Sequence, residues 1–209
     1  MTYRACLVDV FDTVLSVDFE QHNAGLARHA GVDPERFAAV LVADWLHLVM
    51  DGRVSTEDAL AGALHEVGSP IEQDALAALV RADEQLLHDL HVLHDDAVPF
   101  LESLRAAGVR TAFVSNCSSN TRPLLIALGL ADLVDELVLS CEVGAAKPEP
   151  AIYRTALDAL GVQASETVFV DDQRSYCEGA ASVGIDAVLI DRFTSSGDIA
   201  ALGELLERF

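Results

Sequence analysis

Carboxylate side chains stand where two apolar stretches of the sequence end. Asp9 follows the short apolar run of residues 5–8, and the pair Asp171 and Asp172 follows the run of residues 167–170. Ligands of open α/β sheets bind beyond the carboxyl ends of the strands, so these carboxylates would lie where chemistry occurs if both runs are strands. A carboxylate can act as a nucleophile, and a neighbouring carboxylate pair favours a divalent cation that offsets the charge.

Two further segments carry groups that bind anions. Ser115 and Asn116 stand at the end of the stretch VRTAFVS, and Lys147 lies in the segment GAAKPEPAIY, on a loop that enters a helix. Each feature also has a purely structural explanation, because a Ser-Asn pair can cap a turn, a Lys-Pro pair can lie in a solvated loop, and Asp171 with Asp172 can cap the next helix. Taken together and in this order, they predict one anion-handling site.

The spacing of apolar residues predicts the elements that position these groups. After the first strand, further strands are expected at residues 109–115, 137–140, 167–171 and 186–190. Helices are expected at residues 98–107, 122–128, 150–160, 178–183 and 199–207. This alternation predicts an α/β fold with a right-handed, mostly parallel, doubly wound sheet of the Rossmann-like type, covered on both faces.

The block between the first strand and this alternating region has a different character. From about residue 18 to residue 90, Ala and Leu recur at helical spacing and predict four or five short helices. We interpret residues 17–90 as an inserted helical cap on an α/β core formed by residues 1–16 and 91–209. Trp45 and Phe37 are expected to belong to the core of the cap. One face of the cap must nevertheless close over Asp9, so substrate selection is expected near Phe19, Trp45, His47 and Met50.

The composition limits the partners of the protein. Among 209 residues, 13 Lys and Arg face 34 Asp and Glu, which gives a net charge of −21. This charge argues against nucleic acid and anionic membranes as partners, whereas a small anionic substrate needs only local positive charge. The four cysteines show no CxxC spacing, which favours reduced thiols. Because no targeting pattern or long apolar run is present, we expect a cytoplasmic protein that acts on a small molecule.

The ordered set of motifs resembles the haloacid dehalogenase (HAD) superfamily over nearly the whole chain. The phrases LRAAGVRTAFVSN, AKPEPAIY and FVDDQRSYCEGA each look like members of its helical-cap subgroup, and the cap lies between the first and second motifs as in that subgroup. The resemblance implies that Asp9 is the nucleophile and forms an aspartyl intermediate. It also implies that Ser115, with the backbone of Asn116, binds the oxygens of the transferred group, while Lys147 neutralises charge.

A magnesium site is also implied by this resemblance. Asp9, the main-chain oxygen of Phe11, Asp172 and the neighbouring Asp171 would hold Mg²⁺, which favours such oxygen ligands. The implied activity is that of a Mg²⁺-dependent phosphatase acting on a small phosphorylated metabolite.

Two residues of the first motif depart from the pattern of the family's phosphatases. Phe11 stands where those enzymes have a second aspartate that protonates the leaving oxygen and then activates water, a contribution typically worth about 10²–10⁴ in rate. Asp12 stands where they usually have Gly. In an extended chain its side chain faces away from that of Asp9, so it would act as the acid only if the following turn rotates it back.

Two alternative functions follow from these departures. The family's dehalogenases carry an aromatic residue at the position of Phe11 and attack carbon without a metal. They lack the paired carboxylates, however, and they use an arginine of the cap. The corresponding stretch here, VLVADWLHL, contains no arginine, and Arg36 and Arg53 are the nearest. Tyr176 replaces the Asp or Asn that usually orients the lysine or the metal site, and such losses commonly weaken metal affinity about 10–100-fold. A catalytically degenerate binding protein is therefore the third hypothesis.

Overall fold

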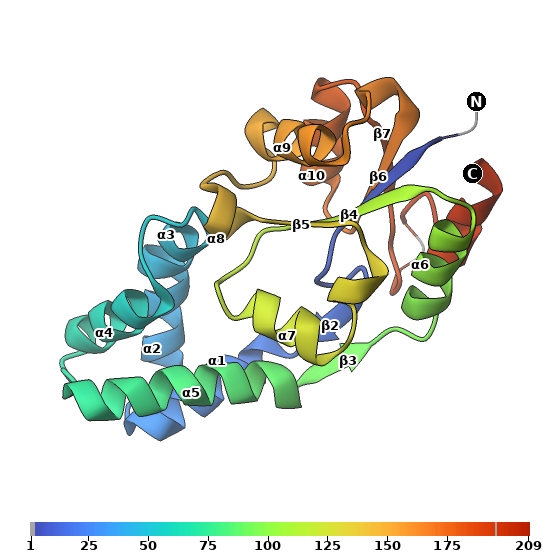
Figure 1. Ribbon diagram of the computed structural model, residues 1–209. Helices are drawn as coiled ribbons and strands as arrows, with labels where there is room; N and C mark the ends of the chain where they lie inside the picture. Colours follow the sequence, from blue (N-terminus) through green and yellow to red (C-terminus); the bar gives the residue numbers. More distant parts are fainter. Residues whose placement is uncertain (1–2, 195) are drawn as a thin grey trace.

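A five-stranded parallel sheet forms the centre of the computed structural model, which describes residues 3–194 and 196–209. The strand order is β5-β4-β1-β6-β7, and helices lie on either side of the sheet in Figure 1. The strands are β1 (Ala5–Val8), β4 (Arg110–Ser115), β5 (Glu136–Leu139), β6 (Thr167–Asp171) and β7 (Asp186–Leu189). The predicted Rossmann-like α/β fold is confirmed.

The central position of β1 explains its apolar sequence. Its four residues are buried because β4 pairs with it on one side and β6 on the other, both in parallel. The N–H group of Asp9 continues this pairing by donating to the main-chain oxygen of Val170 over 3.0 Å. Parallel pairing brings the carboxyl ends of the three strands to one edge, so Asp9, Ser115 and Asp171 are placed on the same side of the sheet.

Helices cover both faces of the sheet, as expected for alternating strands and helices. The side chains of β1 alternate between two cores, because Cys6 and Val8 belong to one apolar cluster and Ala5 and Leu7 to the other. The first cluster includes residues of α6 (Ala97–Ala106), α7 (Thr121–Ala127) and the 3₁₀ helix η4 (Leu202–Arg208). The second includes residues of α9 (Pro150–Leu160) and α10 (Arg174–Ser182).

The bounds of several elements differ from the predicted ones. The helix predicted for residues 199–207 is a 3₁₀ helix that begins at Leu202, because Ile199 instead forms an isolated β-bridge with Ile190. Helix α10 begins four residues before the predicted 178, directly after the turn in which the N–H group of Gln173 donates to the Asp171 carboxylate over 2.7 Å. The strand predicted for residues 137–140 ends one residue earlier than expected, because Ser140 begins a short helix, α8 (Ser140–Val143).

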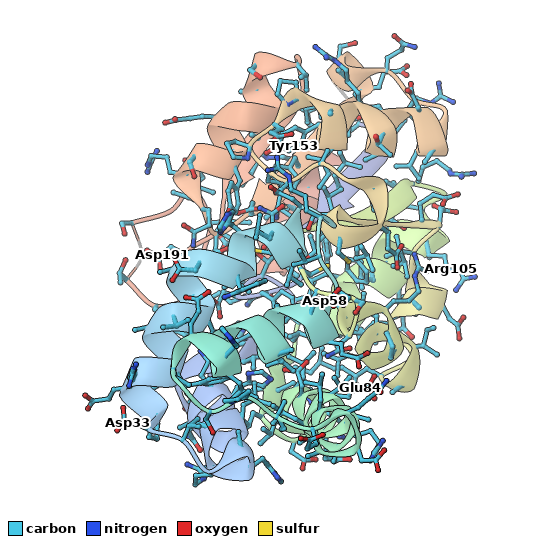
Figure 2. All side chains as sticks on the ribbon, turned by 90° about the vertical axis from the view of Figure 1, so that its left-hand side faces the viewer. Asp33, Asp58, Glu84, Arg105, Tyr153 and Asp191 are labelled. Carbon is cyan, nitrogen blue, oxygen red and sulfur yellow. The ribbon has the colours of Figure 1, made fainter. Side chains whose placement is uncertain are left out.

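The cap is a helical unit with its own apolar core. Figure 1 shows its helices grouped together, and Figure 2 shows the labelled cap residues Asp33 and Glu84 at the end of the molecule away from Tyr153 of the α/β core. Ser55 caps one helix by accepting a hydrogen bond from the N–H group of Asp58 over 3.0 Å. The helices are α1 (Phe19–Ala30), α2 (Pro34–Val40), the π-helical turn η1 (Leu41–Trp45), α3 (Leu46–Met50), α4 (Thr56–Glu66) and α5 (Gln73–Asp89).

A two-stranded antiparallel ribbon joins the cap to the core. Strand β2 (Leu15–Val17) enters the cap and pairs with β3 (His91–Leu93), which returns from it. The domain division proposed from the sequence, between residues 16 and 17 and between 90 and 91, falls at this ribbon. Within residues 3–194 and 196–209, none of the helices is long and apolar enough to cross a membrane.

Candidate active site

Lys147 lies at the centre of the site formed by the strand ends. Its Nζ donates hydrogen bonds to Asp9 Oδ1 and to Asp171 Oδ2, each over 2.6 Å. Lys147 is 3% exposed, Asp9 5% and Asp171 0%, so solvent ions screen these two ion pairs little. The lysine therefore joins the end of β1 to the end of β6 and brings together three of the residues predicted from the sequence.

Asp172 completes a group of three carboxylates. Oxygen atoms of Asp9, Asp171 and Asp172 lie within 4.8 Å of one another. Burial, and then the charge of Asp9, raise the pKa of Asp172 to about 6. Burial also raises the pKa values of Asp9 and Asp171, against the opposing effect of Lys147. Burial would by itself lower the pKa of Lys147, but the two carboxylates raise it, so the lysine is charged and one positive charge faces three acidic groups.

The three-carboxylate group fits a magnesium ion. Mg²⁺ takes oxygen ligands and is usually held by one or two carboxylates together with waters. Asp9, Asp171 and Asp172 each provide carboxylate oxygens. Lys147 does not neutralise all of their negative charge, so the group would attract a cation. The main-chain oxygen of Phe11, expected as another ligand, belongs to the turn directly after β1, and its role stays a prediction.

Two buried hydroxyl groups near the strand ends have no hydrogen-bond partner within the described part of the protein. They are Ser115 Oγ, at the end of β4, and Thr13 Oγ1, in the turn after β1. An unsatisfied buried polar group costs about 1–3 kcal/mol, so these hydroxyls are candidates for bonds to a ligand. The sequence predicts this role for Ser115 but misses Thr13, although a hydroxyl residue four positions after Asp9 is a visible signal.

The side chain of Asn116 holds the backbone of Lys147. Its Nδ2 donates to the Lys147 main-chain oxygen over 2.8 Å, and its Oδ1 accepts from the Lys147 N–H group over 2.7 Å. Both ends of the amide are therefore engaged, which fixes the loop that carries the lysine. The predicted contact of Asn116 with a substrate would use its backbone, as the sequence analysis expects.

The turn after β1 contains Asp12, one of the residues that depart from the family pattern. Asp12 has a positive φ of 56°, a left-handed conformation that Asp adopts more readily than most residues other than Gly. Asp12 does not belong to the three-carboxylate group, although its charge adds to the effects that raise the pKa of Asp172. Its predicted role as an acid stays untested by this placement.

Tyr176 contacts the lysine through its aromatic ring. Lys147 Nζ lies 4.9 Å from the centre of the Tyr176 ring and 5.5 Å from that of Phe169. A cation near an aromatic face is attracted by the ring, by about 0.5–2 kcal/mol depending on desolvation. The tyrosine thus stabilises the ammonium group by this attraction, without adding a fourth negative charge to the crowded site.

An apolar cavity of about 340 Å³ lies between the cap and the loops at the strand ends. Among the four cap residues expected to select the substrate, Phe19 and Met50 line it, whereas Trp45 and His47 do not. Trp45 instead packs against Gly62 and donates from Nε1 to Glu66 over 3.0 Å, so its role is to hold the cap together. The core residues that line the cavity are Phe11, Asn116, Cys117, Ser118 and Thr121.

A buried polar cluster joins the cap to the core beside this cavity. His22 Nε2 of α1 lies 3.0 Å from Asp83 Oδ1 of α5, and Asn120 Nδ2, just before α7, donates to the other oxygen of Asp83. Burial alone would lower the pKa of His22, but Asp83 raises it above its usual value. Sequence reasoning misses this cluster because its members are far apart in the chain and belong to no shared motif.

Replacing Lys147 should destabilise the protein strongly. A Lys147→Met variant leaves Asp9 and Asp171 buried without their cation, and breaking a buried ion pair in this way typically costs about 3–5 kcal/mol. Urea unfolding in the presence of EDTA measures the loss. In a Lys147→Met/Asp171→Asn variant one carboxylate is also removed, so part of the stability should return. If the Lys147→Met variant is as stable as the native protein, the two ion pairs contribute nothing to the free energy of unfolding.

Comparison with known proteins identifies the family. The model of the haloacid dehalogenase-like hydrolase family matches residues 3–184. The chain belongs to this family, and the predicted resemblance is confirmed; the protein is a HAD-type hydrolase.

Similar proteins include both phosphatases and dehalogenases. The chain is 38% identical over 121 residues to phosphatase MT3486 of Mycobacterium tuberculosis, a match that covers 54% of this chain and 56% of that protein. It is 32% identical over 203 residues to (S)-2-haloacid dehalogenase 1 of a Pseudomonas species, covering 90% and 85%. Among solved structures, the HAD phosphatase from Thermococcus onnurineus has a TM-score of 0.69 and 26% identity, with 99% and 97% of the two chains covered.

Proposed function

We propose that this hydrolase is a Mg²⁺-dependent phosphatase that acts on a small phosphorylated metabolite in the cytoplasm. The observation that carries the proposal is the group of three carboxylates around one buried lysine. Asp171 and Asp172 add negative charge that a metal-free attack on carbon does not need. A divalent cation would offset that charge and attract the phosphoryl oxygens of a substrate.

The residues of the site can each take one part in the reaction. A carboxylate oxygen of Asp9 attacks phosphorus, forms the aspartyl phosphate and displaces the alcohol oxygen. The Ser115 hydroxyl and the N–H group of Asn116 donate to the phosphoryl oxygens, and Lys147 stabilises the negative charge near Asp9. Mg²⁺ held by Asp9, Asp171, Asp172 and the main-chain oxygen of Phe11 would supply further charge stabilisation. Water then attacks phosphorus, breaks the bond to Asp9 and releases phosphate.

The absence of an acid at Phe11 predicts a preference among leaving groups. A phenylalanine has no proton to donate, so the departing oxygen must leave as an anion or take its proton from water. Esters with good leaving groups, such as p-nitrophenyl phosphate, should therefore react much faster than alkyl esters.

An assay of phosphate release tests the proposal. Purified protein should hydrolyse p-nitrophenyl phosphate in the presence of Mg²⁺, lose this activity in EDTA and regain it when Mg²⁺ is added in excess. Asp172→Asn should need a higher Mg²⁺ concentration, by about 10-fold or more, because it removes a charged ligand. Hydrolysis that is equally fast in EDTA would contradict the role of the metal, and inactivity toward all phosphate esters would contradict the phosphatase itself.

Dehalogenation of 2-haloacids is a second candidate, favoured by the aromatic Phe11. In that reaction Asp9 would displace halide from carbon, and water would then hydrolyse the resulting ester. The cavity offers no lysine or arginine among its described lining residues, and Arg36 and Arg53 are not part of its wall. A halide ion would thus leave into apolar surroundings, which disfavours this candidate. Release of chloride or bromide from 2-haloacids in EDTA would reverse the ranking.

A further inference from the structure

We propose that the cavity between cap and core selects phosphate monoesters whose organic part is uncharged and mainly apolar, rather than sugar phosphates or esters with a second anionic group. This inference rests on the proposed phosphatase function and names the substrate class of the same site. It follows from the position of the cavity, from the character of its wall, and from the hydrogen bonds that its polar residues already make.

Two residues of the cavity wall are neighbours in the chain of candidate catalytic residues. Phe11 follows the nucleophile Asp9 by two residues, and Asn116 follows Ser115 directly; both Phe11 and Asn116 line the cavity. Asp9, Ser115 and Lys147 are not among the described lining residues, so a group esterified to a phosphoryl held at Asp9 would enter the cavity past Phe11 and Asn116. The position that carries an acid in the family's phosphatases here carries a ring that extends the apolar wall, with Phe11 and Phe19 packed at a ring-centre distance of 5.6 Å.

The wall of the cavity provides apolar contacts for the organic part of an ester. It provides no lysine or arginine, among its described lining residues, for a second anionic group on the substrate. Aliphatic side chains from η1, α3 and α4, including Leu41, Leu46, Met50 and Leu60, form much of the wall. A cavity of about 340 Å³ is at the small end of the range of ligand sites, so the organic group must itself be small.

Three polar residues of the wall, His22, Asp83 and Asn116, are engaged with protein groups. His22 and Asp83 pair over 3.0 Å, and Asp83 also accepts from Asn120. The Asn116 amide bonds to the backbone of Lys147 at both ends. The hydroxyls of a sugar would therefore leave water and find few free partners here, and a buried hydroxyl without a partner lowers affinity.

A series of alkyl phosphates tests the inference. The value of kcat/KM in Mg²⁺ should rise about 4-fold for each methylene from methyl phosphate upward, until the cavity is full. Glycerol phosphate, glucose 6-phosphate and phosphoglycolate should react more slowly than a butyl ester. Because alkyl esters react slowly without an acid, calorimetric binding of methyl, butyl and hexyl phosphonates to the same protein supplies a measurement that is independent of turnover.

Two matched variants separate the cavity from general charge effects. Val42→Arg places a cation at a wall residue that is itself 51% exposed, whereas Ala43→Arg adds the same charge to the same turn at another exposed residue, which does not line the cavity. Val42→Arg should lower kcat/KM for butyl phosphate about 10-fold or more and raise it for phosphoglycolate relative to butyl phosphate. Ala43→Arg should keep the native order of substrates.

The outcomes distinguish the inference from the function on which it rests. Hydrolysis of sugar phosphates in preference to alkyl phosphates, or an equal change in both arginine variants, would overturn the inference and leave the phosphatase intact. Inactivity toward every ester, together with phosphonate binding that does not depend on chain length, would overturn both.

Discussion

An Asp9→Asn variant should remain folded and lose hydrolytic activity by on the order of 10⁴-fold or more, the scale seen when a nucleophile is removed. An amide oxygen is a poor nucleophile, and the asparagine also removes the charge that Lys147 faces. Stability should change little, because Lys147 keeps its bond of 2.6 Å to Asp171 and one of three crowded acidic groups is gone. Steady-state assays with p-nitrophenyl phosphate, combined with thermal unfolding, measure the two effects separately.

An Asp12→Asn variant provides the matched comparison in the same turn. Asn tolerates the positive φ of residue 12 as well as Asp does, so the backbone should be preserved. If Asp12 only shapes the turn, its variant should keep activity within a few-fold of the native value. A loss comparable to that of Asp9→Asn would instead make Asp12 the missing acid, and an Asp9→Asn variant with full activity would refute Asp9 as the nucleophile.

A Phe11→Asp variant should gain phosphatase activity toward alkyl phosphates by about 10²–10⁴-fold, which is the usual contribution of a general acid and base. The carboxyl group would protonate the departing oxygen and then activate the water that attacks the aspartyl phosphate. Little gain is expected with p-nitrophenyl phosphate in the first step, because that leaving group needs no proton. The comparison of the two substrates in one variant therefore identifies acid catalysis.

Phe11→Asn controls for the loss of the ring. Both variants lose the contact between Phe11 and Phe19 and should cost about 1–3 kcal/mol of stability, but only the aspartate has a proton to transfer. Equal activity of the two variants would show that the turn after β1 does not present residue 11 to the leaving group. A gain in activity toward alkyl phosphates that is confined to Phe11→Asp would show that the native Phe11 extends the apolar wall of the cavity and, in doing so, removes acid catalysis.

The two replaced positions of the family pattern share one physical consequence. Phe11 stands where the phosphatases of the family have an aspartate, and Tyr176 places an aromatic ring 4.9 Å from Lys147 Nζ where the family usually has Asp or Asn. Both replacements put an aromatic ring where a polar side chain is usual in the family. The surroundings of Lys147, Asp9 and Asp171 are therefore more apolar.

Local sequence patterns are sufficient to predict the sheet and the edge at which the candidate site residues meet. Apolar runs that end in Asp9, Ser115 and Asp171 identify buried strands, and parallel pairing then brings their ends together whatever the details of packing. The helix at 150–160 was also predicted with its observed bounds, because Pro150 begins it and Gly161, in a left-handed conformation, ends it. Such signals are local, so they can be read without the fold.

The contacts between side chains depend on how whole elements pack, which local patterns do not reveal. The bonds from Lys147 to Asp9 and Asp171, and from Asn116 to the Lys147 backbone, join segments that are separate in the chain. The placement of Trp45 inside the cap likewise depends on its contact with Gly62 on another helix. The spacing of residues along the chain determines which face of an element a side chain occupies. The rotation and packing of whole elements determine the distances between side chains, and therefore the cavity between the cap and the core.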